Sequence, residues 1–317
     1  MNNILIRIAV FSALTLSGQV YATESKLSIN GALEVEMSGD QISAPKVELE
    51  FNQLLNQQVN ADMVLLYEQG ETILDTAAIN FAPRGAHWSM SLGYLFVPFG
   101  HFDTAMAFDP INKTLAESKE QALLYDFQLS NLTTSLYWFN GTNNVAGKSA
   151  IDNYGIQFTH ASEFMRTSFG YINDIGDSNV LQQLINTQLG NNNTNTMVAG
   201  QSIAWSLHNG DFALNTELVT TQTAFQAGQL AATAVQPSTT NIEVNYRFHL
   251  AGSESILAVG SQSSVDAAAL AIPKARTMLA VNTTIQKDAS LILQLAQDTD
   301  YSDVVTSVYA VKLSVEF

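Results

Sequence analysis

The sequence contains no cysteine, so no disulfide contributes to its stability. Charged residues make up only 13% of the chain, about half the ~25% that is usual in soluble domains. No apolar run reaches the ~20 residues that a transmembrane helix requires, and the mean hydropathy is only +0.07. A hydrophobic content of 46% is too high for a disordered acidic chain. These absences exclude a disulfide scaffold, a helical membrane protein and a disordered tail.

Basic residues are fewer than acidic residues. Lys and Arg number 13 against 29 Asp and Glu, which gives a net charge of -16. A surface of this sign repels phosphate, so no nucleic-acid partner is expected.

The N-terminus has the pattern of a secretory signal. A weakly basic lead, 1–7, precedes a short apolar core, 8–16, and Val20-Tyr21-Ala22 supplies a small-residue cleavage site. A transmembrane anchor is the alternative, but the apolar stretch is too short for one. We therefore expect residues 1–22 to be a signal peptide and residues 23–317 to be one domain.

Strict alternation of apolar and polar residues recurs along the mature chain, as in "YAVKLSVEF" at the C-terminus. This period of two is the mark of a β-strand with one buried face. The pattern predicts about 16 strands of roughly ten residues, the length that crosses a bilayer when tilted. The expected strands are 26–37, 45–55, 59–68, 73–82, 87–97, 121–130, 132–140, 151–159, 164–173, 197–207, 211–221, 239–249, 254–262, 275–283, 289–298 and 306–317.

The connections between these strands alternate in length. Short turns follow the even-numbered strands, whereas mostly longer links, such as 99–120 and 174–196, follow the odd-numbered ones. A soluble β-sandwich would scatter its long links over both ends. The predicted fold is all-β: an up-and-down antiparallel β-barrel in the outer membrane of a Gram-negative bacterium, with long extracellular loops.

Outward positions near both rims carry aromatic residues, as lipid interfaces favour. They are Phe81, Trp88, Phe158, Phe212, Phe248 and Phe317 near the periplasmic rim, and Tyr67, Tyr94, Phe96, Trp138, Tyr171 and Tyr309 near the other. Outer-membrane lipid is therefore an expected partner. The final Phe317 resembles the C-terminal signal that such barrels present to their assembly machinery, a second expected partner.

Inward positions are polar, and acids outnumber bases. The expected lumen-lining residues are Glu34, Glu36, Glu48, Glu50, Asp62, Asp126, Glu217, Glu243, Arg166, Arg247, Arg276 and Lys312. We expect Glu34 to face Glu50 and Glu36 to face Glu48, a destabilising pairing of like charges. Either nearby Lys residues and lumen water compensate for it, or the patch attracts cations or loosely holds a divalent ion.

The link at 97–121 is long and not especially polar, and links of that length are usually functional or disordered. In porin-like barrels such a loop folds into the lumen and narrows it; the alternative is that it plugs or braces the wall. Its candidate constriction residues are Phe99, His101, Phe102, Asp103, Asp109, Lys113, Glu117 and Glu120. His101 has no partners at ligand spacing, so no metal site and no cofactor are expected. The link 174–196 contains a short helical pattern near 179–185 and is interpreted as a solvated excursion rather than a lid.

Several segments resemble the legiobactin-receptor-like siderophore porins, the LbtU type. These are "LGYLFVPFGHFDT", "DPINKTLAESKEQALLYDF", "YWFNGT", "GYINDIGDSN", "AAALAIPKAR" and "AQDTDYSD", spread over roughly 73–303, with 92–127 the most specific. The resemblance implies an outer-membrane barrel that takes up a ferric siderophore without an energised plug. The few residues between Ala22 and the first strand agree with passive uptake. The family's periplasmic coiled-coil region is not expected in this chain.

Several functions follow from these patterns. The first is a passive porin-like channel for a ferric siderophore or a similar small polar solute. The second is a general cation-preferring diffusion porin without a ligand site. A phosphate porin is disfavoured because anion pores need basic rings. An enzyme is not expected, since His160, His208 and His249 lie near the periplasmic turns; an adhesin or purely structural barrel is a further alternative.

Overall fold

The computed structural model describes residues 27–39, 41–141, 152–189 and 196–317. The predicted signal peptide, 1–22, lies outside the described residues.

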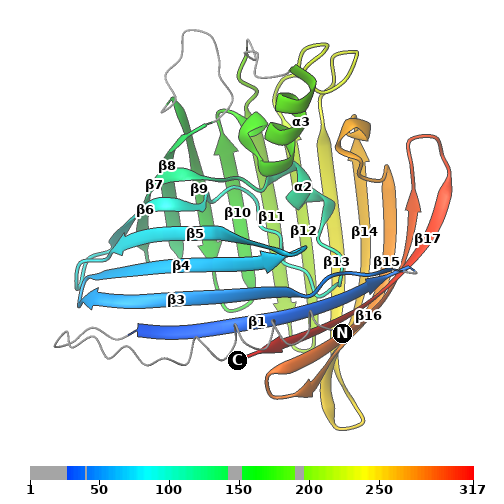
Figure 1. Cartoon of the computed structure of the whole chain (residues 1–317), viewed down its shortest axis with the longest axis horizontal. Helices are drawn as coiled ribbons and strands as arrows, with labels where there is room; N and C mark the ends of the chain where they lie inside the picture. The colour runs from blue at the N-terminus through cyan, green and yellow to red at the C-terminus, as the bar shows by residue number, and fades with distance from the viewer. Residues whose placement is uncertain (1–26, 40, 142–151, 190–195) are drawn as a thin grey trace.

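The chain forms sixteen long strands and one very short one, β2. Their bounds are β1 Leu27–Ser38, β2 Gln41–Ile42, β3 Lys46–Asn56, β4 Val59–Glu68, β5 Glu71–Phe81, β6 Trp88–Phe96, β7 Lys119–Leu129, β8 Leu132–Asn140, β9 Asn153–Ala161, β10 Met165–Ile172, β11 Gly200–Asn209, β12 Phe212–Thr221, β13 Ser238–Leu250, β14 Ser253–Val265, β15 Ala275–Gln286, β16 Ala289–Thr299 and β17 Val305–Glu316. Each long strand is antiparallel to the next, and β1 pairs with β17, which closes the sheet. Figure 1 shows the near and far walls crossing at a steep angle, as tilted barrel strands do. The predicted closed antiparallel barrel is confirmed.

The last residue completes the closure. The Gly31 amide donates to the Phe317 carbonyl and the Phe317 amide donates to the Gly31 carbonyl, both at 2.9 Å. A closed sheet leaves no row of unpaired backbone groups to face lipid, where each would cost several kcal/mol. This explains why the alternation continues to the C-terminus.

The register between β1 and β3 differs from the one we expected. Glu34 lies opposite Lys46 on β3, and Glu36 lies opposite Lys312 on β17. The predicted facing pairs of glutamates are therefore wrong. Opposite charges attract across adjacent strands, whereas like charges repel, so this register is the more stable one.

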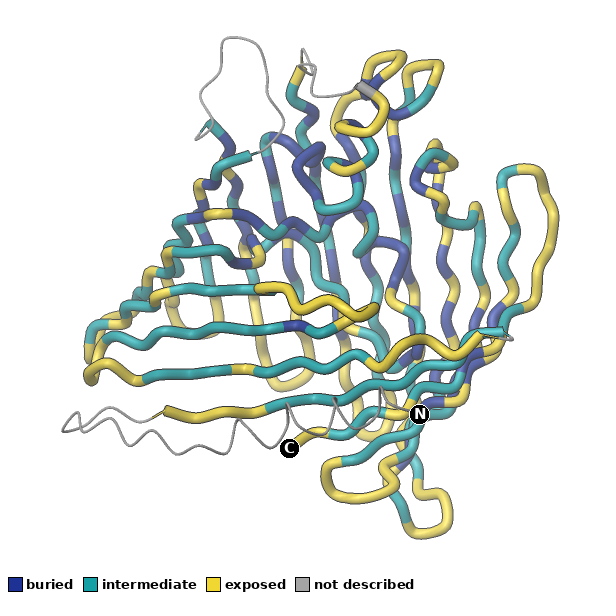
Figure 2. The backbone as a smooth tube through the Cα atoms, in the orientation of Figure 1, coloured by how far each residue is buried: buried dark blue, intermediate teal, exposed yellow. Residues whose placement is uncertain are grey.

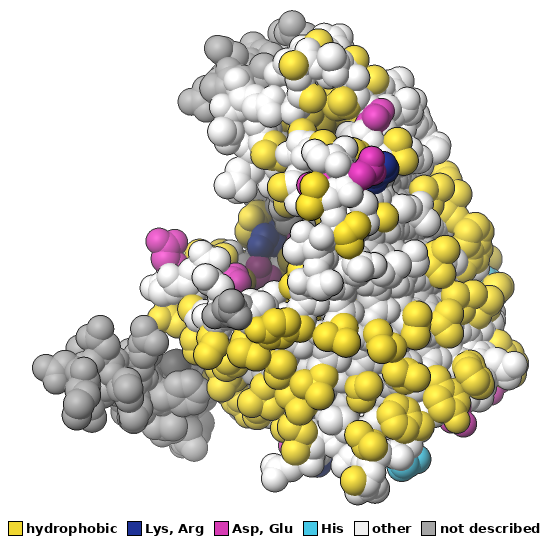
Figure 3. Space-filling view, turned by 90° about the vertical axis from the view of Figure 1, so that its right-hand side faces the viewer, with side chains coloured by type: hydrophobic (Ala, Val, Ile, Leu, Met, Phe, Trp, Pro, Cys, Tyr) yellow, Lys and Arg dark blue, Asp and Glu magenta, His cyan; other side chains and the backbone are white. Residues whose placement is uncertain are grey.

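The outward side chains of the barrel are hydrophobic and exposed. Figure 3 shows a broad band of them across the face formed by the last strands. Large exposed aromatic residues include Phe96, Phe127, Trp138, Phe158, Trp205, Phe212, Tyr246, Tyr309 and Phe317. Such an apolar belt on a closed barrel is suited only to lipid, so the chain is embedded in the outer membrane. Among the described residues, no helix has the length and hydrophobicity to span a bilayer.

Links at the two ends of the barrel differ in length, as predicted. The short turns at one end are 57–58, 82–87, 130–131, 162–164, 210–211, 251–252 and 287–288. Links at the other end carry the helices α2 (Ile111–Ala116) and α3 (Asn179–Leu189) and the 3-10 turns η1 (Ile175–Asp177) and η2 (Ala268–Leu270).

These long links share one hydrophobic core with the inner wall. In α3, Leu181 and Ile185 are buried, and they belong to the same cluster as Leu115 of α2, Phe225 and Leu270. Figure 2 shows the buried backbone gathered around these helices and the strands behind them. The interpretation of 174–196 as a solvated excursion is wrong, because α3 has an apolar face that packs on the links around it.

Gly155 of β9 leaves room for a buried tyrosine ring. A Cβ at this position would overlap with the Tyr137 ring at Cζ and with its hydroxyl. The ring is fully buried, and its hydroxyl donates to the Tyr171 carbonyl at 3.2 Å, so it cannot simply swing away.

We therefore expect Gly155→Ala to destabilise the barrel by about 1–3 kcal/mol, as overpacking does. Urea unfolding in lipid vesicles, followed by tryptophan fluorescence, measures the change. Adding Tyr137→Leu should restore part of the loss, because it removes the obstructing ring. Additive losses in the double variant would contradict this explanation.

Candidate functional site: the narrowed lumen

The link between β6 and β7, residues 97–118, lies against the lumen face of the opposite wall; we call it the inner loop. Its backbone binds three inward side chains. The His101 amide donates to Glu217 Oε1 at 2.6 Å, and the Ala105 amide donates to Glu243 Oε1 at 2.9 Å. The Ala107 amide donates to Gln294 Oε1 at 2.6 Å. The inner loop is thus fixed across β12, β13 and β16.

Apolar contacts add to this docking. Met106 and Ala107 pack on an apolar patch of the inner wall that consists of Ala258, Met278, Ala280, Ile292, Ala296 and Ala310. Gly260 lies beside it, where a Cβ would come within 2.8 Å of Met106 Cε. Part of the lumen wall is therefore apolar, contrary to the expectation of a polar lining, because the inner loop covers it instead of water.

Phe108 of the inner loop also contacts a half-buried ion pair. The Arg276 guanidinium donates twice to Asp298, at 2.7 Å each, and lies 5.2 Å from the centre of the Phe108 ring. The bidentate pairing neutralises the arginine. Arg276 therefore supports the loop rather than presenting a free positive charge to the lumen.

Helix α2 ends the inner loop and carries its own charge pairs. Lys113 Nζ lies 2.9 Å from Asp109 and 3.5 Å from Glu117. Burial alone would lower the pKa of Lys113, but the hydrogen bond to Asp109 and both negative charges outweigh it and hold the pKa above its ordinary value. Lys113 thus stays protonated, and its positive charge is balanced by the two neighbouring carboxylates.

The exposed face of the inner loop is acidic. The side chains of Asp103 and Asp109 are 64% and 68% exposed. A hydrogen bond from His101, whose Nε2 lies 2.9 Å from the carboxylate, lowers the pKa of Asp103. Asp103 also lies within electrostatic reach of Arg166 on β10, and Asp109 within reach of Glu36 on β1. The two exposed carboxylates of the inner loop thus act on charged groups of two different strands, β10 and β1.

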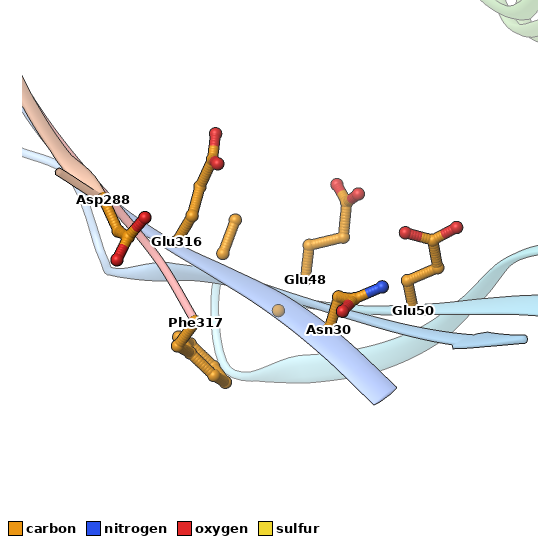
Figure 4. Close-up of a pocket in the computed structure, with 8 residues that line it drawn as sticks. Asn30, Glu48, Glu50, Asp288, Glu316 and Phe317 are labelled. Carbon is orange, nitrogen blue, oxygen red and sulfur yellow. The ribbon is translucent and has the colours of Figure 1, made fainter. Parts of the chain in front are cut away.

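Acidic residues also line the periplasmic mouth. A cavity of 460 Å³ there is lined by Asn30, Gly31, Ala32, Glu48, Glu50, Asp288, Glu316 and Phe317. In Figure 4 the carboxylates of Glu48, Glu50 and Glu316 point to the same side of the strands, whereas the Phe317 ring points to the other. Within the described part of the chain, none of the four acids that line the cavity has an ion-pair partner.

Most bases of the lumen, by contrast, have an acidic partner. Lys312 pairs with Glu34 at 2.9 Å, and Arg247 pairs with Glu254 at 3.2 Å near the periplasmic rim. Among the described inward bases, Arg166 and Lys46 have no ion pair; the charge of Arg166 acts on Asp103, and Lys46 lies opposite Glu34. The unpaired charge that remains in the lumen is therefore mostly negative.

Two further predicted acids are held by neutral partners. The Asp62 carboxylate accepts hydrogen bonds from the amides of Asn52, Asn60 and Asn80 on the same wall. Asp126 accepts one from Ser135 at 2.5 Å. Both acids are half-buried.

Several predicted site residues occupy other positions than expected. Phe99 is buried against β10, and Glu217 and Glu243 are covered by the inner loop. Glu120 belongs to β7 and is buried beneath α3, where Gln182 donates to it at 3.1 Å. These residues hold the fold together instead of lining open water, because the links pack over them.

Sequence reasoning missed the docking residues Gln294, Thr104 and Asn112. Gln294 occupies an inward position between Leu293 and Leu295, so the alternation of β16 contained the signal. Thr104 and Asn112 lie in the inner loop, where no periodic pattern shows which side chains face the wall. The described residues contain no cluster of three or more His, Cys, Asp or Glu that suits a metal ion.

The fold and this lumen define the class of the protein, an outer-membrane barrel of the porin type with an inner loop. Solved structures of similar fold agree with this class. The outer-membrane channel DcaP of Acinetobacter baumannii has a TM-score of 0.63 at 11% identity, covering 92% of this chain and 97% of that chain. OmpF of Salmonella typhi, in complex with daunomycin, has a TM-score of 0.60 at 11% identity, covering 92% and 98%. The anion-selective porin of Comamonas acidovorans has a TM-score of 0.59 at 11% identity, covering 92% and 99%.

Relatives in sequence are UPF0422 proteins. One from Coxiella burnetii is 22% identical over 223 residues, covering 67% of this chain and 48% of that protein. Another, lpp3030 from Legionella pneumophila strain Paris, is 22% identical over 317 residues, covering 91% and 59%. The chain thus spans about half the length of these relatives. No family model matches the sequence.

Proposed function

We propose that the protein is a passive channel that admits small polar solutes across the outer membrane and prefers cations. The observation that carries this proposal is the imbalance of unpaired charge along the lumen. Glu48, Glu50 and Glu316 have no ion pair among the described residues, whereas Arg276 and Lys312 are neutralised. A lumen of one charge sign concentrates counter-ions and repels co-ions.

The route for solute runs beside the inner loop. The loop covers the lumen face of β12 to β16, so its exposed edge and the wall around β1 and β3 border the remaining space. Figure 3 shows a hollow above the apolar band in which side chains of both signs are visible. The constriction is therefore expected between Asp103, Asp109 and the facing wall.

A planar bilayer tests the proposal. Under a tenfold KCl gradient, the reversal potential of the purified protein should have the sign of K⁺ preference, and the preference should weaken as salt screens the carboxylates. A reversal potential of the opposite sign would reject the proposed selectivity. Absence of any conductance would reject the channel itself.

A ferric siderophore is the second candidate solute. The stretch with the most specific resemblance to siderophore porins, 92–127, is the one that forms β6, the inner loop and β7, and so borders the lumen. If a siderophore passes here, adding it at micromolar concentration should interrupt the K⁺ current in single-channel records. A strain that lacks this protein should then take up less labelled ferric siderophore under iron limitation. Unchanged current together with unchanged uptake would reject siderophore transport and leave only the proposal of a general channel.

A further inference from the structure

Five polar side chains meet between the inner loop and the wall with atoms that have no hydrogen-bond partner within the described residues. The atoms are Asn112 Oδ1, Glu217 Oε2, Thr239 Oγ1, Asn241 Oδ1 and Gln262 Oε1. All five residues are at most 3% exposed. Buried polar groups in native proteins are nearly always satisfied, so such a group of orphaned oxygens implies an occupant.

The five residues are neighbours in the fold. Glu217 is paired with Asn241 across β12 and β13, and Asn241 is paired with Gln262 across β13 and β14. Thr239 is the next inward residue along β13. Side chains at such paired positions are about 4.5–5.5 Å apart at Cβ. Together they form one patch on the inner wall.

Helix α2 covers this patch. It contacts β12, β13 and β14, and the Asn112 amide nitrogen donates to the Glu217 backbone carbonyl at 3.1 Å. That bond fixes the orientation of the Asn112 amide, so the atom left without a partner is its carbonyl oxygen, an acceptor. The site is closed on one side by the wall and on the other by α2.

The charge of Glu217 is not balanced by protein. One carboxylate oxygen accepts from the His101 amide, the other has no partner, and no Lys or Arg in the described chain pairs with the group. A buried charge without a counter-ion costs several kcal/mol. The Asn112 and Glu217 oxygens are both acceptors, so neither can satisfy the other. A bridging water could donate to both oxygens but would leave the carboxylate charge unbalanced, whereas a cation between them satisfies both oxygens and the charge.

We infer that a monovalent alkali cation, Na⁺ or K⁺, binds between α2 and strands β12 to β14. Glu217 and Asn112 are its ligands from the wall and the inner loop, and the oxygens of Thr239, Asn241 and Gln262 complete an all-oxygen shell of the kind that hard cations prefer. A single carboxylate neutralises a monovalent ion, whereas a divalent ion would leave a buried positive charge. The bound cation fastens α2 to the wall.

The direct test is a crystal structure of the full-length barrel grown in Tl⁺, whose anomalous scattering marks alkali-cation sites. A peak between Glu217 and Asn112 is expected in the wild type and should be lost in Glu217→Gln and in Asn112→Leu. A Tl⁺ peak confined to the open carboxylates Glu48 and Glu50, or no peak, would overturn the inference.

A second measurement does not depend on crystals. The thermal unfolding midpoint in detergent should fall when NaCl is replaced by N-methyl-D-glucamine chloride at equal ionic strength. Glu217→Gln should abolish this difference, whereas the matched control Glu50→Gln, in the open lumen, should retain it. If the wild type shows no cation dependence and Glu217→Gln is as stable, a protonated carboxyl donating to Asn112 occupies the place of the cation, and the inference is wrong.

Discussion

Replacing residues 99–116 with an Asn-Gly turn is expected to raise the single-channel conductance several-fold. The segment occupies part of the lumen of a sixteen-stranded barrel, a size that otherwise encloses an aqueous channel. Its two ends already meet, because Phe96 pairs with Lys119 and the Val97 amide donates to the Ser118 carbonyl at 3.0 Å. A short turn can therefore join β6 to β7 without moving either strand.

A milder variant keeps the inner loop but weakens its attachment. Glu243→Ala with Gln294→Ala removes the acceptors of Thr104, Ala105, Ala107 and Phe108. Each buried donor left without a partner costs about 1–3 kcal/mol. In bilayer records we expect the current through the open channel to be noisier and its conductance to be larger. Arg247→Ala with Glu254→Ala, an exposed pair at the rim, is the control.

Unchanged conductance in the turn replacement would show that the inner loop does not limit the pore.

Reversing two charges at the periplasmic mouth is expected to abolish or invert the cation preference. Glu48→Lys with Glu50→Lys changes carboxylates that project into the mouth cavity. In water, a unit charge changes the energy of an ion 4 Å away by about 1 kcal/mol. This energy corresponds to about a fivefold change in the permeability ratio of K⁺ to Cl⁻. The reversal potential in a KCl gradient should thus move toward that of Cl⁻, most strongly at low salt.

The matched control carries the same change in charge elsewhere. Glu68→Lys with Glu71→Lys alters a pair at the extracellular turn between β4 and β5. Those residues lie at the rim, so the reversal potential should move much less. Equal shifts in both double variants would show that overall charge, and not the charge of the mouth, sets the selectivity.

The alternation of side chains predicted the barrel because each residue faces either lipid or the lumen, and that choice depends only on its place in a strand. The period of two therefore located nearly all strands and assigned Leu313 and Phe317 to the outside. It could not determine register, since a shift of two residues keeps every side chain on its face. In the structure Glu34 lies opposite Lys46, and its ion pair is with Lys312 on the neighbouring strand.

The candidate site was predictable only in part. The length of the link after β6 pointed to a functional loop, but the inward positions of Glu217 and Glu243 on their own implied contact with water. Docking of the inner loop converts them into buried acceptors. Large apolar residues on the inward face, such as Met278 and Ile292, were a sequence signal that something covers this wall.

The sequence by itself determined a closed, lipid-facing barrel with an acidic lumen, because solvent contact along a strand is a local property. The tertiary structure alone decided which inward side chains meet water and which lie under the inner loop and α3. That division depends on contacts between residues more than a hundred positions apart, such as His101 with Glu217 and Ala107 with Gln294. No local pattern encodes such contacts.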